Sequence, residues 1–377
     1  MRKHCLASKL FRSLRILHFS PTFQDQMTAR RVVELELVAV GLLLMVQCCV
    51  QLRNTHPLHE IVDKVNENGG PYIGLVMAYP TEEMALQTSG VFVPNSQIPW
   101  VDLAGRRFNI GKIKNIDVIY VMTGEQTLNA GITVQILLDV FDIEGVVHYG
   151  TAGSSNDSLS LGDVSVMKYV AFTSSWKWKE FESKKGKLPE LKFGAFNFPE
   201  RGENLLAKVE FTPSQLLSTG KLMEEIFWLP VDSRWFNISA QLQDFELQQC
   251  INDTYCLPER PKVVFGLLGS TADIYLDNAA YREFLFRELN VSTVDEESAS
   301  IVMTCLSNGV PSIVFRGISD LAGGEEKLLS SSLSSLASIN ALSVAVEFIA
   351  LLDKENRLHD HQKQVKSFSF YTQHLST

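Results

Sequence analysis

The chain has 377 residues, 45% of them hydrophobic, and a formal net charge of −9 at pH 7. This size and apolar content suit one large globular domain or two small ones. The negative charge and the lack of a long basic run in the body of the sequence argue against nucleic-acid binding, because such binding needs basic residues at the phosphates. No His/Cys cluster has metal-ligand spacing, so the sequence predicts no metal or other cofactor.

The first 50 residues predict an N-terminal extension and a signal peptide. Residues 1–20 are basic and contain no acidic residue, and an apolar run of 14 residues spans 37–50. This run is shorter than the about 20 residues that a membrane-spanning helix needs, but it suits the apolar region of a signal peptide. We expect cleavage near residues 50–56, no stable membrane span afterwards, and a mature protein in the secretory pathway, extracellular or vacuolar.

The sequence leaves alternatives open for the start of translation and for the role of the N-terminal segment. Met27 is the favoured start, which makes residues 1–26 an upstream extension. Glu34 and Glu36 fit poorly in the charged lead of a signal peptide. A retained membrane anchor, or a transit peptide built from residues 1–30, is the alternative reading of the same segment.

Sequons and cysteines agree with export. Four Asn-x-Ser/Thr sequons predict N-glycosylation, at Asn156, Asn237, Asn252 and Asn290. Three cysteines follow the signal peptide. Cys250 and Cys256 lie in an irregular stretch and predict a disulfide, because the chain is expected to cross an oxidising compartment. Cys305 lies in an apolar helical pattern and predicts a buried free thiol.

Strand and helix patterns alternate from Pro71 onward. The expected strands are 72–78, 117–124, 145–153, 161–172, 262–270 and 311–320, and the expected helices are 130–141, 277–289 and 334–355. Residues 292–309 are expected to form a short strand end followed by a helix that Asn-Gly closes. This alternation predicts one α/β domain with a central, mostly parallel or mixed sheet and helices on both faces. The domain is expected over 71–353, with a long insertion at 173–261 and a polar, frayed C-terminal tail at 354–377.

Acids, glycines and hydroxyls follow several expected strands, where ligands bind in such sheets. Asp320 ends the strand 311–319, and partial burial would let its carboxyl hold a proton near neutral pH. An N-cap role is the alternative for Asp320. Gly150 and Gly153 allow a sharp turn beside Thr151, and such loops bind phosphate, water or ribose oxygens.

Three acids, Asp295, Glu296 and Glu297, precede the apolar part of the helix expected within 292–309. Thr293 and Glu296 match a capping box, and acids suit the positive end of a helix dipole. These patterns favour structural roles for Asp295 and Glu296. Glu297 is left over, and a carboxylate there can accept two hydrogen bonds from a vicinal diol such as a ribose.

The motifs "IGLVMAYPTEE", "GVVHYGTAGS", "LGD", "VDEESA" and "GISD", in this order, resemble the nucleoside phosphorylase/nucleosidase superfamily. The resemblance covers roughly 71–353 and matches 173–261 poorly. It is most similar to methylthioadenosine/adenosylhomocysteine nucleosidases and to the plant bark-storage and vegetative-storage branch. It implies the nucleoside phosphorylase-like fold, a purine-type nucleoside such as a cytokinin riboside as substrate, phosphate or water as the attacking group, and a homo-oligomer.

The same resemblance implies roles for individual residues. Asp320 matches the acid that protonates or hydrogen-bonds purine N7, and Ser319 matches its neighbour in that motif. Glu297 matches the carboxylate that binds the ribose diol. Thr151 matches a residue that binds phosphate or the attacking water. Glu82 matches the acid that orients this water, although a plain helix start is its alternative, and Glu83 replaces it if the alignment slips by one residue.

This sequence also departs from the family pattern. Glu296 stands where the nucleosidases carry Met, which makes that edge of the site more polar. Ile274 falls on the position of a base-stacking Phe, so the adjacent Tyr275 is the candidate for stacking. Arg106 follows a glycine as a phosphate-binding arginine does, but the nearby basic residues favour an ordinary basic surface as the alternative.

Two functions follow from these residues. The first is cleavage of the N-glycosidic bond of a purine-type nucleoside, by phosphorolysis or hydrolysis. The alternative is a vegetative or bark storage glycoprotein that keeps the fold with little or no activity. For either, Glu297 and Asp320 are expected to face one pocket, because the ends of parallel strands share one rim of the sheet.

Overall fold

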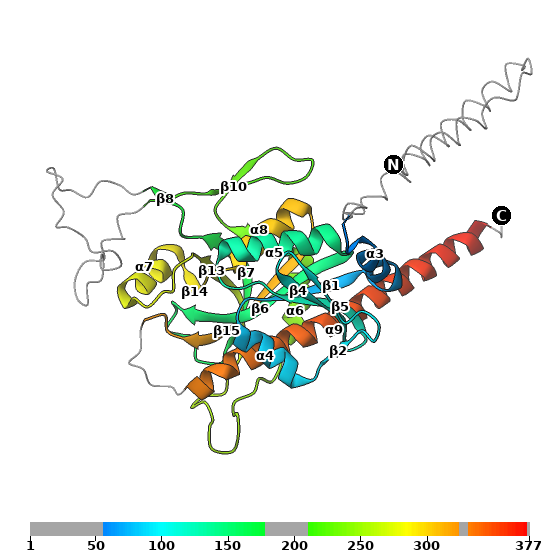
Figure 1. Ribbon diagram of the computed structural model, residues 1–377. Helices are drawn as coiled ribbons and strands as arrows, with labels where there is room; N and C mark the ends of the chain where they lie inside the picture. Colours follow the sequence, from blue (N-terminus) through cyan, green and yellow to red (C-terminus); the bar gives the residue numbers. More distant parts are fainter. Residues whose placement is uncertain (1–55, 178–209, 324–330, 375–377) are drawn as a thin grey trace, which may run out of the picture. The chain divides into compact units, whose positions relative to one another are not determined.

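The computed structural model describes residues 56–177, 210–323 and 331–374 (Figure 1). The predicted extension, signal peptide and cleavage position lie outside these residues. Within them, the main sheet has 11 strands. They are β1 (Tyr72–Met77), β2 (Phe92–Pro94), β3 (Trp100–Leu103), β4 (Arg106–Ile113), β5 (Ile116–Met122), β6 (Ile143–Ser154), β7 (Val164–Phe172), β12 (Leu229–Pro230), β13 (Val263–Thr271), β14 (Val291–Asp295) and β15 (Ser312–Asp320).

Most central strand pairs of the sheet are parallel, but β14 pairs antiparallel with β6 and β15 pairs antiparallel with β7. β1 lies parallel to both β5 and β6, and β6 lies parallel to β15. β13 lies parallel to β7 and β14. β4 pairs antiparallel with β5, β2 and β3 at one margin. The predicted mixed sheet is therefore confirmed, and the runs of Val and Ile in β1, β5 and β6 match strands that are buried on both faces.

One half of the sheet curls until it closes on itself. β6 pairs with β15, β15 with β7, β7 with β13, β13 with β14, and β14 returns to the end of β6. Gly153 is the meeting point, because it pairs with Asp320 on one side and with Val294 on the other. The sequence did not predict this closure. It brings the ends of β6, β14 and β15 together at one rim.

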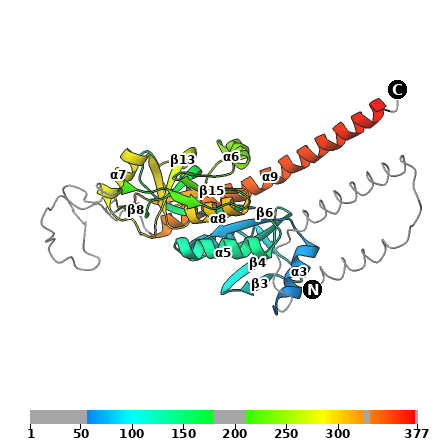
Figure 2. The ribbon, with the colours of Figure 1, turned by 90° about the horizontal axis from the view of Figure 1, so that it is seen from above.

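Helices cover both faces of the sheet (Figures 1 and 2). α3 (His59–Asn68) and α5 (Thr127–Val140) share one hydrophobic cluster with β1 and β5, and α8 (Ser298–Asn308) packs beside α5. α4 (Pro80–Ser89), α6 (Ser233–Ser239) and α9 (Ser331–His374) pack on the opposite face. α7 (Ala279–Leu289) lies against β14. The predicted α/β class with helices on both faces is confirmed.

α9 is the longest helix of the described residues. Its stretch from Ser335 to Arg357 is long and apolar enough to cross a membrane, but 67% of the most apolar window is buried in the protein. Phe348 packs on Phe315 and on Trp235, as expected of a core helix. The sequence predicted an end at 355 and a frayed tail. That end is wrong, because the polar stretch up to His374 contains no glycine or proline and the helix continues.

The region 173–261 contributes to the same fold. Its described part adds β12 to the main sheet, the helix α6, the short helix η2 (Ala240–Leu242), and two small two-stranded sheets. These small sheets are β8 (Trp176–Lys177) with β9 (Glu210–Phe211), and β10 (Ser214–Leu216) with β11 (Glu224–Ile226). The predicted Cys250–Cys256 disulfide is confirmed, and so is the buried free thiol of Cys305. Burial raises the pKa of Cys305 to about 12.

We predict that Gly317→Ala destabilises the fold by at least about 2 kcal/mol, because a methyl group there would collide with the backbone of Ala337 on α9. Urea unfolding measures the effect. Gly131→Ala is the control, because only the mobile hydroxyl of Ser300 stands close to that position in α5, and alanine favours a helix. Equal stability of Gly317→Ala and the wild type would contradict this packing.

Candidate functional site

The rim formed by the strand ends carries most of the predicted site residues. Glu82 follows β1, Thr151 lies near the end of β6, Glu297 follows β14, and Asp320 ends β15. Glu82 and Glu297 are buried, at 2% and 5% exposure, although both are charged residues. Buried carboxylates need partners, because an unpaired charge away from water is costly. Glu297 has such a partner in a residue that the sequence analysis missed, and Glu82 lies close enough to the same residue to affect its pKa.

Arg316, in the middle of β15, is this partner. Its side chain is 1% exposed, its Nε donates to Asp295 Oδ2 at 3.0 Å, and its Nη2 donates to Glu297 Oε2 at 2.8 Å. A Cβ on Gly150 would collide with both Arg316 Nη1 and Glu82 Oε1, so glycine leaves the space in which they approach each other. We call Arg316, Asp295, Glu297 and Glu82 the Arg316 cluster.

The cluster sets one cation against three carboxylates. Burial alone would lower the pKa of Arg316, but Asp295, Glu297 and Glu82 raise it, so the guanidinium stays charged. His148, buried on β6, adds no charge near neutral pH, because burial and Arg316 lower its pKa to about 3. Because one positive charge faces three acids, it cannot compensate three negative charges, and ionisation of all three acids is unfavourable. Burial, helped by Asp295 and Glu82, accordingly raises the pKa of Glu297 to about 7 in spite of Arg316.

Asp295 holds the cluster and also caps α8. Its Oδ1 accepts from the backbone N–H groups of Glu297 (3.2 Å) and Ser298 (3.0 Å) and from the hydroxyl of Thr271 (2.7 Å). The predicted structural role of Asp295 is confirmed. The predicted capping box of Thr293 with Glu296 is wrong, because β14 continues through Asp295 and the helix begins only at Ser298.

One carboxylate oxygen of Glu297 has only a weak hydrogen-bond partner. Oε2 is held by Arg316, while Oε1 accepts only a long 3.4 Å hydrogen bond from Gln126 N. Gln126 begins α5 with a φ of 81°, a conformation that brings its N–H to the rim. Glu296 is half-buried near Glu125 and Asp273, and burial, followed by these acids, raises its pKa. The edge of the site beside Glu297 is therefore acidic.

Glu82 connects the start of α4 with Thr151. Its Oε2 accepts from the N–H groups of Ala78 and Tyr79 (2.9 and 3.0 Å), as an acid at the third helical position does. Its Oε1 accepts from Thr151 N (2.6 Å) and Thr151 Oγ1 (3.1 Å). Glu82 therefore stabilises the start of α4 and also contacts Thr151. Glu83, the alternative to Glu82, lies instead near Gln87 and Arg107.

Asp320 is half-buried at the end of β15. Its Oδ2 accepts from Ser319 Oγ and its Oδ1 from Ala322 N, both at 2.7 Å. Tyr275, on the loop after β13, is 83% exposed, and the charge of Asp320 is the main cause that raises its pKa. Its phenol therefore lies near Asp320. Asp320 also lines a cavity of about 280 Å³, but Glu297 does not line this cavity. Their expected common pocket stays a prediction.

Arg106 lies apart from the rim cluster. Its Nε donates to Thr133 Oγ1 on α5 at 2.7 Å, Nη1 donates to Ala104 O at 2.8 Å, and Nη2 makes a long bond to Asn129. These bonds fix the guanidinium on α5 and do not direct it to Thr151. Arg107, next to it, pairs with Asp102 and covers the ring of Trp100.

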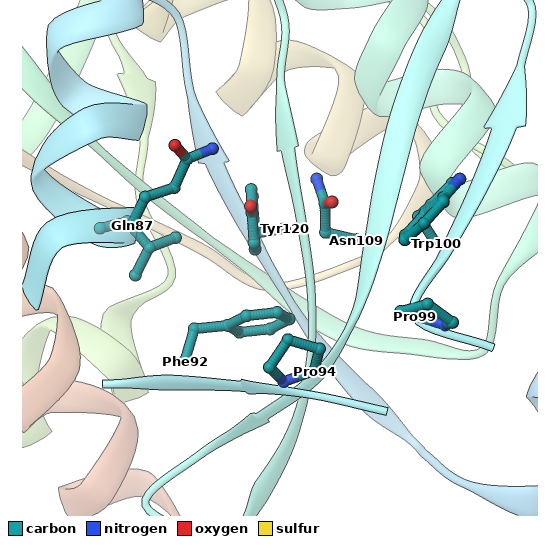
Figure 3. A pocket seen from close by; sticks show the side chains of 8 residues that line it. Gln87, Phe92, Pro94, Pro99, Trp100, Asn109 and Tyr120 are labelled. Atoms are coloured by element: carbon teal, nitrogen blue, oxygen red, sulfur yellow. The ribbon is translucent and has the colours of Figure 1, made fainter. Parts of the chain in front are cut away.

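A second cavity, of about 230 Å³, lies against β4 and β5 (Figure 3). Tyr120 and Asn109 lie between Gln87 on one side and Trp100 on the other, with Phe92 and Pro94 beside them. None of the predicted site residues lines it. Among the residues that the structure describes, no group of three or more His, Cys, Asp and Glu side chains could hold a metal ion.

We predict that Arg316→Met lowers the free energy of unfolding by about 3–5 kcal/mol, because it leaves Asp295 and Glu297 buried without a countercharge. Chemical denaturation measures this loss. The triple variant Arg316→Met, Asp295→Asn, Glu297→Gln should recover part of it. A loss below about 1 kcal/mol for Arg316→Met would contradict the cluster as described.

The raised pKa of Glu297 predicts a pH dependence of stability. The folded state holds this proton up to about pH 7, whereas the unfolded chain releases it near 4.5. The stabilisation is complete below about pH 4.5 and is lost as the pH rises through about 7. The stability of the wild type relative to Glu297→Gln should therefore fall over this range. A relative stability that rises with pH would show the opposite pKa shift.

Known proteins that are similar to this chain include a storage protein and a nucleosidase. Residues 72–350 match the model of the Phosphorylase superfamily. Bark storage protein A from Populus deltoides is 45% identical over 279 residues, which cover 74% of this chain and 88% of that protein. A 5′-methylthioadenosine/S-adenosylhomocysteine nucleosidase from Staphylococcus epidermidis is 25% identical over 250 residues, 64% of this chain and 88% of that enzyme.

The fold has a counterpart among solved structures. A 5′-methylthioadenosine/S-adenosylhomocysteine nucleosidase from Colwellia psychrerythraea, in complex with adenine, superposes with a TM-score of 0.53 at 19% identity. The match covers 74% of this chain and 95% of that enzyme. On the match over residues 72–350 and the identity to the bark storage protein, this chain belongs to the phosphorylase superfamily.

Proposed function

We propose that the rim binds a purine-type nucleoside and supports cleavage of its N-glycosidic bond. The observation that carries this proposal is the Arg316 cluster, which holds Glu297 and the Glu82–Thr151 pair around one buried guanidinium. Asp320 stands at the same rim, across Gly153 from β14. The relatives named as nucleosidases act on purine nucleosides, and the fold neighbour binds adenine, which supports the same ligand class.

Each residue has a distinct task in this reaction. Glu297 Oε1 accepts hydrogen bonds from the ribose 2′- and 3′-hydroxyls, and Arg316 keeps the carboxylate in place as a positioning residue. The C1′–N9 bond breaks, its electron pair leaves with the base, and Asp320 delivers a proton or a hydrogen bond to N7. The oxygen of water or phosphate then bonds to C1′. Holding these groups together removes most of the entropic cost of the encounter.

Glu82 and Thr151 are the residues that would bind the attacking water or phosphate. Glu82 could accept a proton from a water molecule once that water replaces the hydroxyl of Thr151 at Oε1, because its carboxylate now accepts four hydrogen bonds. Phosphate would have to replace Glu82 as the acceptor of the hydrogen bonds from the N–H and hydroxyl of Thr151, because both groups now donate to that carboxylate. Arg106 is directed toward α5 and would need a different rotamer to assist phosphate. Both attacks are chemically compatible with the site, and they give different products.

A storage role is the second candidate, and the sequence identities favour it over turnover. The bark storage protein is 45% identical, whereas the two nucleosidases described above are 25% and 19% identical. A secreted storage glycoprotein would also explain the predicted signal peptide and the sequons. Asn252, inside the disulfide loop, and Asn290, after α7, are exposed and accessible for glycosylation. In this role the rim would bind nucleosides with little or no turnover.

Incubation of the purified protein with adenosine, inosine, methylthioadenosine and a cytokinin riboside, with and without phosphate, separates these functions. Release of free base only with phosphate identifies a phosphorylase, and release under both conditions identifies a hydrolase. No base from any substrate would contradict the enzymatic proposal and leave the storage role.

If the protein turns over a nucleoside, Asp320→Asn should lower kcat by about 10²–10⁴-fold with a small change in KM, because proton delivery to N7 develops in the transition state. Glu297→Gln should raise KM and lower kcat, because the diol is held throughout. Steady-state kinetics measure both. Asp102→Asn, which removes an exposed carboxylate near Trp100, is the control. Undiminished kcat in Asp320→Asn would remove its role as the acid.

A further inference from the structure

The cavity against β4 and β5 shares no lining residue with the Arg316 cluster (Figure 3). Its apolar lining consists of Leu86, Phe92, Pro94, Pro99 and Trp100, and its polar lining consists of Gln87, Asn109 and Tyr120. Among the described residues, no charged side chain lines it. A charged ligand would lose water here without gaining a countercharge, so the cavity favours a neutral ligand.

Three side chains from three neighbouring strands form a row along this cavity. Trp100 of β3 pairs with Asn109 of β4, and Asn109 pairs with Tyr120 of β5. Side chains of paired residues point to the same face of a sheet. Because neighbouring strands lie about 4.8 Å apart, the backbones that carry the two large rings are separated by about 10 Å. The short asparagine therefore leaves a notch between Trp100 and Tyr120.

The aromatic rings around this notch do not lie parallel. Phe92 packs edge-on against Tyr120, with ring centroids 4.7 Å apart and an interplanar angle of 84°. Trp100 is 49% exposed, and Arg107, outside the cavity lining, covers one face of its ring. A flat heterocycle would stack on only one of two perpendicular rings, whereas a saturated ring can direct C–H groups at both. The cavity therefore suits a saturated ring.

The two amides offer hydrogen bonds of both kinds. Among the described residues, the side chain of Asn109 makes only a long bond, in which Nδ2 donates to Arg107 O at 3.4 Å. The amide of Gln87 donates to the carboxylate of Glu83 and shares a hydrogen bond with the phenol of Tyr120, so it is held at the cavity wall. An amide both donates and accepts, as a hydroxyl group does. Hydroxyl groups on the ligand would therefore match this polar lining.

We propose that this cavity binds the ring of a neutral hexopyranose, as a free sugar or as the terminal sugar of a glycan. A pyranose has C–H groups on its faces for the aromatic rings and hydroxyls around its edge for the amides. β-Glucopyranose, with every hydroxyl equatorial, presents C–H groups on both faces. The volume of about 230 Å³ lies below the roughly 300–1,000 Å³ of pockets for drug-sized ligands, so it suits one ring.

Titration of the full-chain protein with methyl β-D-glucopyranoside, followed by calorimetry and by saturation-transfer NMR, tests this inference. A ligand of this size should bind with a Kd of about 1 mM. The NMR signals of the ring C–H groups should receive the strongest saturation, because these groups face the aromatic rings. None of these measurements depends on turnover of a nucleoside at the rim.

Two variants remove the groups that carry the proposal. Trp100→Ala should weaken glucoside binding by at least about fivefold, because one stacking face is lost. Asn109→Ala should weaken it by about 3- to 10-fold, because hydrogen bonds to the hydroxyls are lost. Val93→Ala is the matched control, because Val93 lies between two lining residues on β2, is 63% exposed and does not line the cavity. It should keep the affinity of the wild type.

Failure of the glucoside to bind the wild type saturably overturns the proposal. Glucoside binding that both Trp100→Ala and Asn109→Ala keep overturns it as well. Binding that Glu297→Gln abolishes would place the sugar at the rim and also overturn it. Cellobiose separates the two sources of the ring. An affinity at least equal to that of the glucoside indicates the end of a glycan, and a much weaker one indicates a free sugar.

Discussion

The site depends on one buried cation. Arg316 has an exposure of 1% and contacts carboxylates from the segment after β14, while Glu82 reaches the same point from α4. A guanidinium without these acids would be unstable in the core, and the acids would be unstable without it. The excess of negative charge leaves Glu297 with a raised pKa and one oxygen with only a weak partner. The same charge balance that holds the rim together thus also shapes the carboxylate for which we propose ligand binding.

The closure of the sheet makes this cluster geometrically possible. β14 must return to the end of β6 for Glu297 to reach Arg316, and Gly153 pairs with strands on both sides at the junction. Gly150 has no side chain where Arg316 and Glu82 approach. The insertion adds a wall to the far side of Asp320.

Hydrophobic periodicity was sufficient to predict six of the eleven strands of the main sheet, namely β1, β5, β6, β7, β13 and β15, because these depend on local patterns. The strands β2, β3, β4 and β12 and the helices α3 and α6 were not predicted. The return of β14 to β6 joins residues far apart in the sequence and has no local signal. Arg316 did have one: a charged residue inside the apolar run "SIVFRGISD" requires a buried acid. The acids Asp295, Glu296 and Glu297 were visible in the sequence as possible partners of this arginine. Because helix capping was taken to account for Asp295 and Glu296, the pairing with Arg316 was not predicted. The long polar part of α9 shows the reverse error, since polar composition alone does not end a helix.

The most direct measurement of the central claim compares the binding of adenosine and 2′,3′-dideoxyadenosine to the wild type and to Glu297→Gln. If Arg316 presents Glu297 to the ribose diol, loss of both hydroxyls should weaken binding to the wild type by roughly 10- to 100-fold. The same loss should weaken binding to Glu297→Gln by only a few-fold, because the acceptor is already impaired. Equal losses in the two proteins, or no binding of adenosine to either, would contradict the account.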